Sequence, residues 1–158
     1  MACYNWEELP MILVEDTRNQ IGKHEILNAD FEKRGIKVIR NKLYVGDYAR
    51  LDKQDIAIDT KQSWVEVAGN ICGKQHERFR NECLRAKSAG IRLIILVEEQ
   101  ICVEQWKSPL NRQKKALTQV KGETLAKAMR TMTEKYGVEF MNCDKKDTAE
   151  IILKLLGE

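Results

Sequence analysis

Gly46-Asp47, followed by Ile56-Ala57-Ile58-Asp59-Thr60-Lys61, is the stretch that decides how this chain is interpreted. Successive side chains of an extended strand point to opposite faces, so Asp59 and Lys61 are predicted to share one face of a strand. If Asp47 reaches the same place from the neighbouring strand, two carboxylates can hold a hard divalent cation, Mg²⁺ or Mn²⁺, beside the lysine. The pattern therefore favours metal-dependent hydrolysis of phosphodiester bonds.

Two residues at the end of an earlier apolar run are candidates for the same site. Asp16 ends the run Met11-Ile12-Leu13-Val14-Glu15-Asp16 and is a candidate third carboxylate. Arg18 is a candidate phosphate clamp, because a guanidinium group can bind two phosphate oxygens at once. A salt bridge to a nearby acid is an equally good interpretation of Arg18.

Length and composition indicate one domain over residues 1–158, since the 158 residues with 43% hydrophobic content can build one core. No apolar run is long enough to cross a bilayer, and the N-terminal residues lack the order of a secretion signal. We therefore expect a cytoplasmic protein without a membrane partner. The five scattered cysteines argue against a disulfide framework. Zinc binding by Cys72, His76 and Cys83 is disfavoured because no fourth ligand is evident.

The net charge of +3 leaves room for a local basic surface. Basic residues without acids occupy 107–121, although a solvated loop is an equally good interpretation of that segment. Phosphate contacts carry no sequence code, so recognition of DNA shape is expected. Trp106 is interpreted as an anchor under the loop rather than a base-stacking residue, and His24 and His76 as surface or capping residues. The candidate phosphate-binding residues are Lys74, Arg78, Arg85, Arg112 and Lys114.

Hydrophobic patterning predicts alternating helices and strands. Continuous apolar runs predict buried strands over 11–15 and 91–97. Short runs over 36–40, 43–48 and 54–60 predict an antiparallel meander. The order implies an α/β fold with a central mixed sheet flanked by helices. The remaining predictions are a last strand over 138–141 and helices over 24–33, 64–71, from Gln75 to Gly90, 123–136 and 148–156.

With these motifs in this order, residues 11–156 resemble the XPF/Hef-type nuclease domain, the excision-repair cross-complementation group 4 domain. That family belongs to the PD-(D/E)xK restriction-endonuclease-like superfamily. The residues that carry the resemblance are Asp16-Thr17-Arg18-Asn19, Gly46-Asp47-Tyr48, Asp59-Thr60-Lys61, Gly73-Lys74, Ile94-Ile95-Leu96-Val97-Glu98 and the helix that starts at Gly122-Glu123.

The resemblance implies a restriction-endonuclease-like three-layer fold and a Mg²⁺- or Mn²⁺-dependent DNA endonuclease. Its substrates are expected to be branched, flap or junction DNA, in recombination, repair or phage DNA processing. The compact chain is similar to small stand-alone versions in bacterial or phage-infected cells, so no helix-hairpin-helix domain is expected, and pairing as a homodimer through this domain fits the family. The implied catalytic residues are Asp16, Asp47, Asp59 and Lys61, with the three aspartates as metal ligands.

Four positions depart from the family pattern. Asp59 replaces a glutamate, Thr60 an arginine and Asn19 an acid, and Val65 stands where the family has an aspartate. These departures keep open a second hypothesis, a non-catalytic DNA-binding or partner subunit that retains the nuclease fold. A hydrolase of small phosphoesters is a third hypothesis, and the basic segment argues against it.

Overall fold

The computed structural model describes residues 10–105 and 120–157. The predictions for Trp106, Arg112 and Lys114 therefore lie outside the described residues. None of the helices within these ranges has the length and apolarity that a membrane-spanning segment needs.

Helices alternate with strands along the chain, and all but one of the predicted elements are found within two residues of their expected ends. The strands are β1 (Ile12–Asp16), β2 (Lys37–Asn41), β3 (Tyr48–Arg50), β4 (Ile56–Lys61), β5 (Arg92–Val97) and β6 (Glu139–Asn142). The helices are α1 (Glu25–Lys33), α2 (Trp64–Cys72), α3 (His76–Ser88), α4 (Gly122–Tyr136) and α5 (Thr148–Leu156), with short 3-10 helices η2 (Val103–Gln105) and η3 (Lys145–Asp147).

The six strands form one mixed sheet in the order β2-β1-β3-β4-β5-β6. Strand β3 is antiparallel to both of its neighbours, whereas β4, β5 and β6 are parallel to one another. The predicted antiparallel meander is present only in the pairing of β3 with β4, and it is wrong for β2, which lies at the sheet edge and pairs in parallel with β1. Helix α1 connects β1 to β2, and a helical crossover returns the chain in the same direction.

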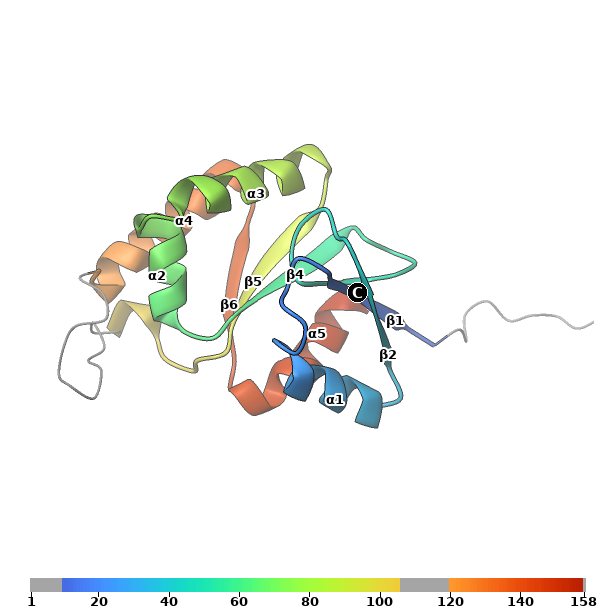
Figure 1. Ribbon diagram of the computed structural model, residues 1–158. Coiled ribbons are helices and arrows are strands. Elements are labelled where there is room, and N and C mark those ends of the chain that lie inside the picture. The colour runs from blue at the N-terminus through green and yellow to red at the C-terminus, as the bar shows by residue number, and fades with distance from the viewer. Residues whose placement is uncertain (1–9, 106–119, 158) are drawn as a thin grey trace, which may run out of the picture.

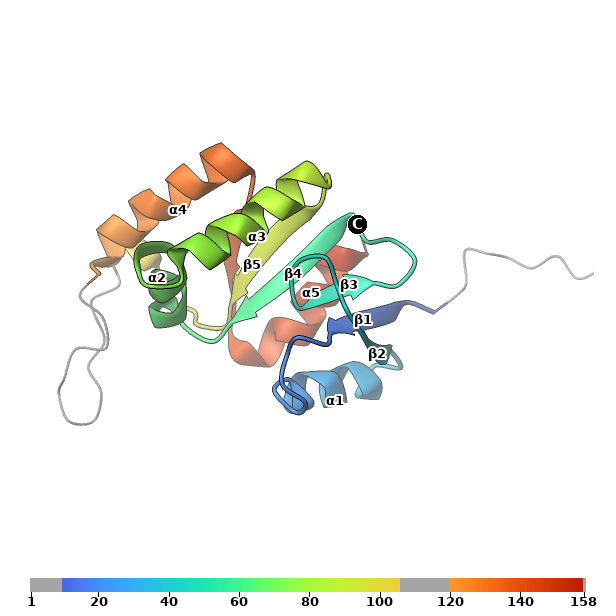
Figure 2. The same cartoon turned by 45° about the horizontal axis from the view of Figure 1, so that its top comes forward.

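Helices cover both faces of the sheet, which gives three layers (Figures 1 and 2). On one face, α2, α3 and α4 pack on alternate residues of β5, including Leu93 and Ile95. On the other face, α1 and α5 pack on the intervening residues Ile94 and Leu96. This two-sided burial explains why β5 is a continuous apolar run.

The chain between β2 and β3 crosses the end of β1 instead of forming the strand predicted over 43–48. The amide of Asp16 donates to the carbonyl of Asp47 at 2.8 Å, and the amide of Asp47 donates to the carbonyl of Ile58 at 2.7 Å. Asp47 is therefore joined through its backbone to the end of β1 and to the middle of β4.

Gly46 makes this close approach possible. Its φ of +78° lies in the left-handed region, and a Cβ atom there would lie 3.0 Å from the Ile58 carbonyl oxygen and 3.1 Å from the Ala57 Cβ. Gly22 has a similar φ of +85°, but a Cβ atom there would meet nothing within 4 Å. The two glycines thus share the backbone conformation and differ in packing.

We expect Gly46→Ala to destabilise the fold more than Gly22→Ala. Both variants carry the cost of a left-handed alanine, about 1–2 kcal/mol. Only Gly46→Ala must also displace the β4 backbone, and such overpacking typically adds a cost of about 1–3 kcal/mol. Urea denaturation of both variants checks the difference in the free energy of unfolding. Equal destabilisation of the two variants would contradict the packing argument.

Candidate active site

Asp47, Asp59 and Lys61 line one pocket of about 260 Å³. Asp47 enters it from the segment before β3, and Asp59 and Lys61 enter it from β4, on the face that α2 and α3 cover. The predicted convergence of the three side chains is therefore present in the geometry. The other lining residues are Asp16, Arg18, Asn19, Lys23, Gly46, Glu66, Asn70, Gln75, Arg78, Phe79, Glu82 and Arg85.

Three donors hold the carboxylate of Asp47. The Asn19 side-chain amide donates to its Oδ1 at 2.9 Å, and the backbone amide and hydroxyl of Thr60 each donate to its Oδ2 at 2.9 Å. Burial alone would raise the pKa of Asp47, but the hydrogen bonds from Asn19 and the Thr60 amide, together with the attraction of His24 and Lys23, hold the pKa below its ordinary value. Asp47 is therefore an oriented anion.

Asp59 is 5% exposed and behaves in the opposite way. Burial raises its pKa well above the ordinary value, and the negative charge of Asp47 raises it further. The attraction of Lys61, whose Nζ lies 3.1 Å from the Asp59 Oδ2, opposes this shift without cancelling it. Asp47 and Asp59 together thus place more negative charge at this point than the surrounding residues stabilise by themselves.

Lys61 remains an ammonium ion in this pocket. Burial would lower its pKa, but the neighbouring carboxylates Asp59, Glu66 and Asp47 together raise it more, so the pKa lies above its ordinary value. A group that keeps its proton cannot act as a general base. The chemistry open to Lys61 is therefore to position an anion or to stabilise negative charge.

The donor set suits a hard divalent cation. A cation between Asp47 and Asp59 would relieve the repulsion that raises the Asp59 pKa. Within 10–105 and 120–157, no group of three or more histidine, cysteine, aspartate or glutamate side chains is arranged to hold a metal ion. This is compatible with Mg²⁺, which commonly takes one or two carboxylates and fills its other positions with water and phosphate oxygens.

Asp16, the candidate third carboxylate, lines the pocket, and both of its oxygens accept hydrogen bonds there. Its Oδ2 accepts from the Arg18 Nε at 2.6 Å, and its Oδ1 accepts from the Leu43 amide at 2.9 Å. Arg18 also donates from Nη2 to the Leu43 carbonyl at 2.9 Å. The salt-bridge interpretation of Arg18 is thus present in the structure, and Asp16 and Arg18 together hold the segment that leads to Asp47.

Two of the predicted phosphate-binding residues reach the pocket from α3. Arg78 and Arg85 line it, whereas Lys74 is exposed just before α3 and does not. Lys23, which the sequence analysis missed, lines the pocket from the turn before α1. A lysine in a turn carries no local signal of such a position. Cations therefore approach the two aspartates from two sides.

The departures from the family pattern have structural partners in this chain. Asn19 and Thr60 are the donors to Asp47, and Glu66, next to Val65, lines the pocket from α2. Glu82, also missed, accepts from the Gly46 amide at 2.9 Å and so ties α3 to the segment that carries Asp47.

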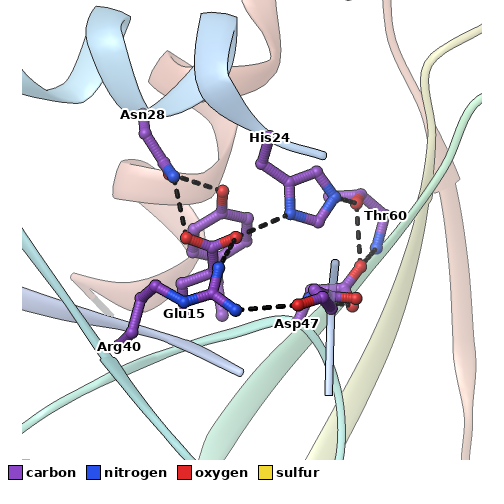
Figure 3. A network of polar contacts seen from close by, with 8 residues as sticks. Glu15, His24, Asn28, Arg40, Asp47 and Thr60 are labelled. Atoms are coloured by element: carbon purple, nitrogen blue, oxygen red, sulfur yellow. Dashed lines mark hydrogen bonds and ion pairs between the residues drawn. The ribbon is translucent and has the colours of Figure 1, made fainter. Parts of the chain in front are cut away.

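The interpretation of His24 as a surface residue is wrong, although His24 does occupy the N-cap position of α1. His24 is 8% exposed, makes no side-chain capping bond to α1, and lies 3.2 Å from the Thr60 hydroxyl through Nε2 (Figure 3). It is buried because the turn before α1 folds back over β4. His76, in contrast, is exposed on α3.

We expect Asp59→Asn to stabilise the metal-free protein above neutral pH. The folded-state pKa of Asp59 is raised, so wild-type stability is fully present below the unfolded value of about 3.9 and is lost as pH rises through the folded pKa. Asparagine keeps the neutral form at every pH. Urea denaturation in EDTA should therefore show a stability advantage at pH 8 that shrinks toward pH 4. Each unit of pKa shift corresponds to about 1.4 kcal/mol.

The matched control is Asp55→Asn, because the Asp55 side chain is 55% exposed. This variant should differ little from wild type at either pH. A wild-type protein that is more stable than Asp59→Asn at pH 8 would contradict the expected sign.

Comparisons with known proteins identify the family. The family model for the ERCC4 domain matches residues 14–155. No curated protein matches the chain at a significant level. Among solved structures, XPF from Aeropyrum pernix is 23% identical with a TM-score of 0.64, and the match covers 92% of this chain and 63% of that chain.

A structure of XPF from Aeropyrum pernix in complex with DNA is similar to the same degree. It is 22% identical with a TM-score of 0.64, and the match covers 93% of this chain and 64% of that chain. The chain thus spans less than two thirds of the length of either structure, and likeness at this identity shows the fold, which confirms the predicted three-layer architecture. Because the family model covers nearly all of the sequence, the chain belongs to the ERCC4 domain family.

Proposed function

We propose that this protein is a divalent-metal-dependent DNA endonuclease that cuts branched, flap or junction DNA in recombination, repair or phage DNA processing. The observation that carries the proposal is the pocket in which Asp47, Asp59 and Lys61 meet. Membership of the ERCC4 domain family supports it, as does the fold shared with a protein solved in complex with DNA. We propose Mg²⁺ or Mn²⁺ as the ion.

The proposed roles follow from the electrostatics of the pocket. Asp47 and Asp59 would hold the cation, which supplies Lewis-acid polarisation of the scissile phosphate and lowers the pKa of the attacking water. Lys61, fixed as an ammonium ion beside Asp59, stabilises the negative charge that develops on the phosphate. The ion pair between Asp16 and Arg18 holds in place the segment that leads to Asp47.

The cations around the pocket suit a phosphate backbone. Arg78 and Arg85 are seven residues apart in sequence, which places them on one side of α3, and both line the pocket. Lys23 lines the same pocket from the turn before α1. These groups neutralise phosphates without contacting base edges in any sequence-dependent way, which supports recognition of DNA shape.

We expect Asp47→Asn and Lys61→Met each to reduce DNA cleavage by about 100-fold or more, because the first removes the charge of a proposed metal ligand and the second removes the cation beside the reacting phosphate. The measurement is cleavage of a panel of branched, flapped and linear DNAs with Mg²⁺, with Mn²⁺ and with EDTA. Lys154→Met is the matched control, since the Lys154 side chain is 72% exposed on α5 and pairs with Glu150. Wild-type rates in both site variants would remove the assignment.

The same panel separates the second candidate, a DNA-binding subunit without catalytic activity. Asn19, Thr60 and Val65 are the sequence departures that motivate it. That candidate requires wild-type protein to bind the DNA panel and to cut none of it at any concentration of either metal.

We expect the double variant Arg78→Ala/Arg85→Ala to weaken DNA binding equally for different base sequences. The slope of its log Kd against log salt concentration should also be shallower, by about 1 for each phosphate that the variant no longer neutralises. Fluorescence anisotropy in EDTA, where no cleavage occurs, measures both effects. Arg80→Ala is the control, because Arg80 is exposed on α3 outside the pocket lining. If the double variant keeps the wild-type slope of log Kd against log salt concentration, these arginines do not belong to the DNA interface.

A further inference from the structure

Four polar side chains from separate segments form a buried chain that ends at Asp47 (Figure 3). Glu15 lies on β1, His24 precedes α1, Thr60 lies on β4, and each of these three is less than 9% exposed. Polar groups buried to this degree are costly unless they are hydrogen-bonded. Because the four side chains come from separate segments, local structure alone does not explain why they are buried together.

Counting donors fixes the direction of the chain. The Thr60 hydroxyl has one proton, and it donates that proton to the Asp47 Oδ2 at 2.9 Å. The hydroxyl can then only accept from the His24 Nε2, which lies 3.2 Å away. This arrangement requires a His24 ring that carries a proton on Nε2.

Glu15 faces the other side of the imidazole, whose Nδ1 has no hydrogen-bond partner among the described residues. Its Oε1 lies 3.4 Å from the His24 Nδ1 and accepts from the Arg40 Nη1 at 3.1 Å. Its Oε2 accepts from the Asn28 side-chain amide at 2.8 Å, and Asn28 in turn accepts from the Tyr48 hydroxyl at 2.7 Å. The carboxylate that faces the imidazole is thus held from two further elements, α1 and β2.

We propose that His24 and Thr60 are positioning residues that fix the carboxylate of Asp47 for metal binding, with Glu15 as their anchor. This inference rests on the proposed nuclease function. Neither His24 nor Thr60 lines the pocket that holds Asp47, Asp59 and Lys61; both line a second cavity, of about 490 Å³. They act on Asp47 without contacting the substrate.

Two pairs of variants separate positioning from mere packing. Thr60→Val keeps the shape and removes the hydroxyl donor, whereas Thr60→Ser keeps the donor. His24→Leu removes the Nε2 donor, whereas the side-chain amide of His24→Gln can still donate. His76→Leu, at an exposed position on α3, is the matched control.

The first readout is binding of Mn²⁺ to the DNA-free protein by calorimetry, with urea denaturation of every variant in parallel. We expect Thr60→Val and His24→Leu to weaken Mn²⁺ binding by about 10-fold or more, as removal of the outer hydrogen-bond partners of metal ligands commonly does. Thr60→Ser and His24→Gln should recover most of the affinity. Folded Thr60→Val and His24→Leu proteins that bind Mn²⁺ as wild type does would reduce both residues to a packing role and overturn the inference.

The second readout is the protonation of the imidazole nitrogens by ¹⁵N NMR of the metal-free wild-type protein. The sequence contains two histidines, so His76→Gln assigns the signals. We expect a proton on the His24 Nε2, and a neutral ring protonated only on Nδ1 would overturn the inference. If the wild-type protein cuts DNA but either readout gives the contradicting result, the proposed function stands and only this inference fails. Wild-type protein that neither binds Mn²⁺ nor cuts DNA refutes both.

Discussion

The backbone of Asp47 joins the end of β1 to the middle of β4, and the rest of the site depends on this junction. Its carbonyl accepts from Asp16 on β1 and its amide donates to Ile58 on β4, so the residue has little freedom to move. A carboxylate on so fixed a backbone can be surrounded by directed donors at little further entropic cost. The absence of a side chain at Gly46 is the geometric condition for the junction, because the β4 backbone occupies the space that a Cβ atom would need.

Local patterning predicted the parts of the fold that local physics controls. The two-residue period of β4 placed Asp59 and Lys61 on one face, and continuous apolar runs located β1 and β5, which are buried on both sides. The meander failed because strand order depends on the crossover through α1, which no run of residues in β2 encodes. The buried state of His24 was missed for a similar reason, since its partners come from distant segments of the chain.

The departures from the family pattern take on a different meaning in three dimensions. At the level of sequence, Asn19 and Thr60 count as losses of an acid and of a cation. In the folded chain both are donors to Asp47, and they help to keep its pKa low although burial acts in the opposite direction. A substitution that removes one charge can therefore leave the electrostatic task of the site intact when neighbouring groups take it over.

Two cavities adjoin the site, and Lys23 and Glu66 line both of them. Asp59 and Lys61 line the first cavity, whereas Thr60 and His24 line the second, beside α1. Under the proposed function, Thr60 and His24 could be exchanged together for other hydrogen-bond donors without altering a side chain that lines the first cavity. The support behind Asp47 is in that sense a replaceable part of the site.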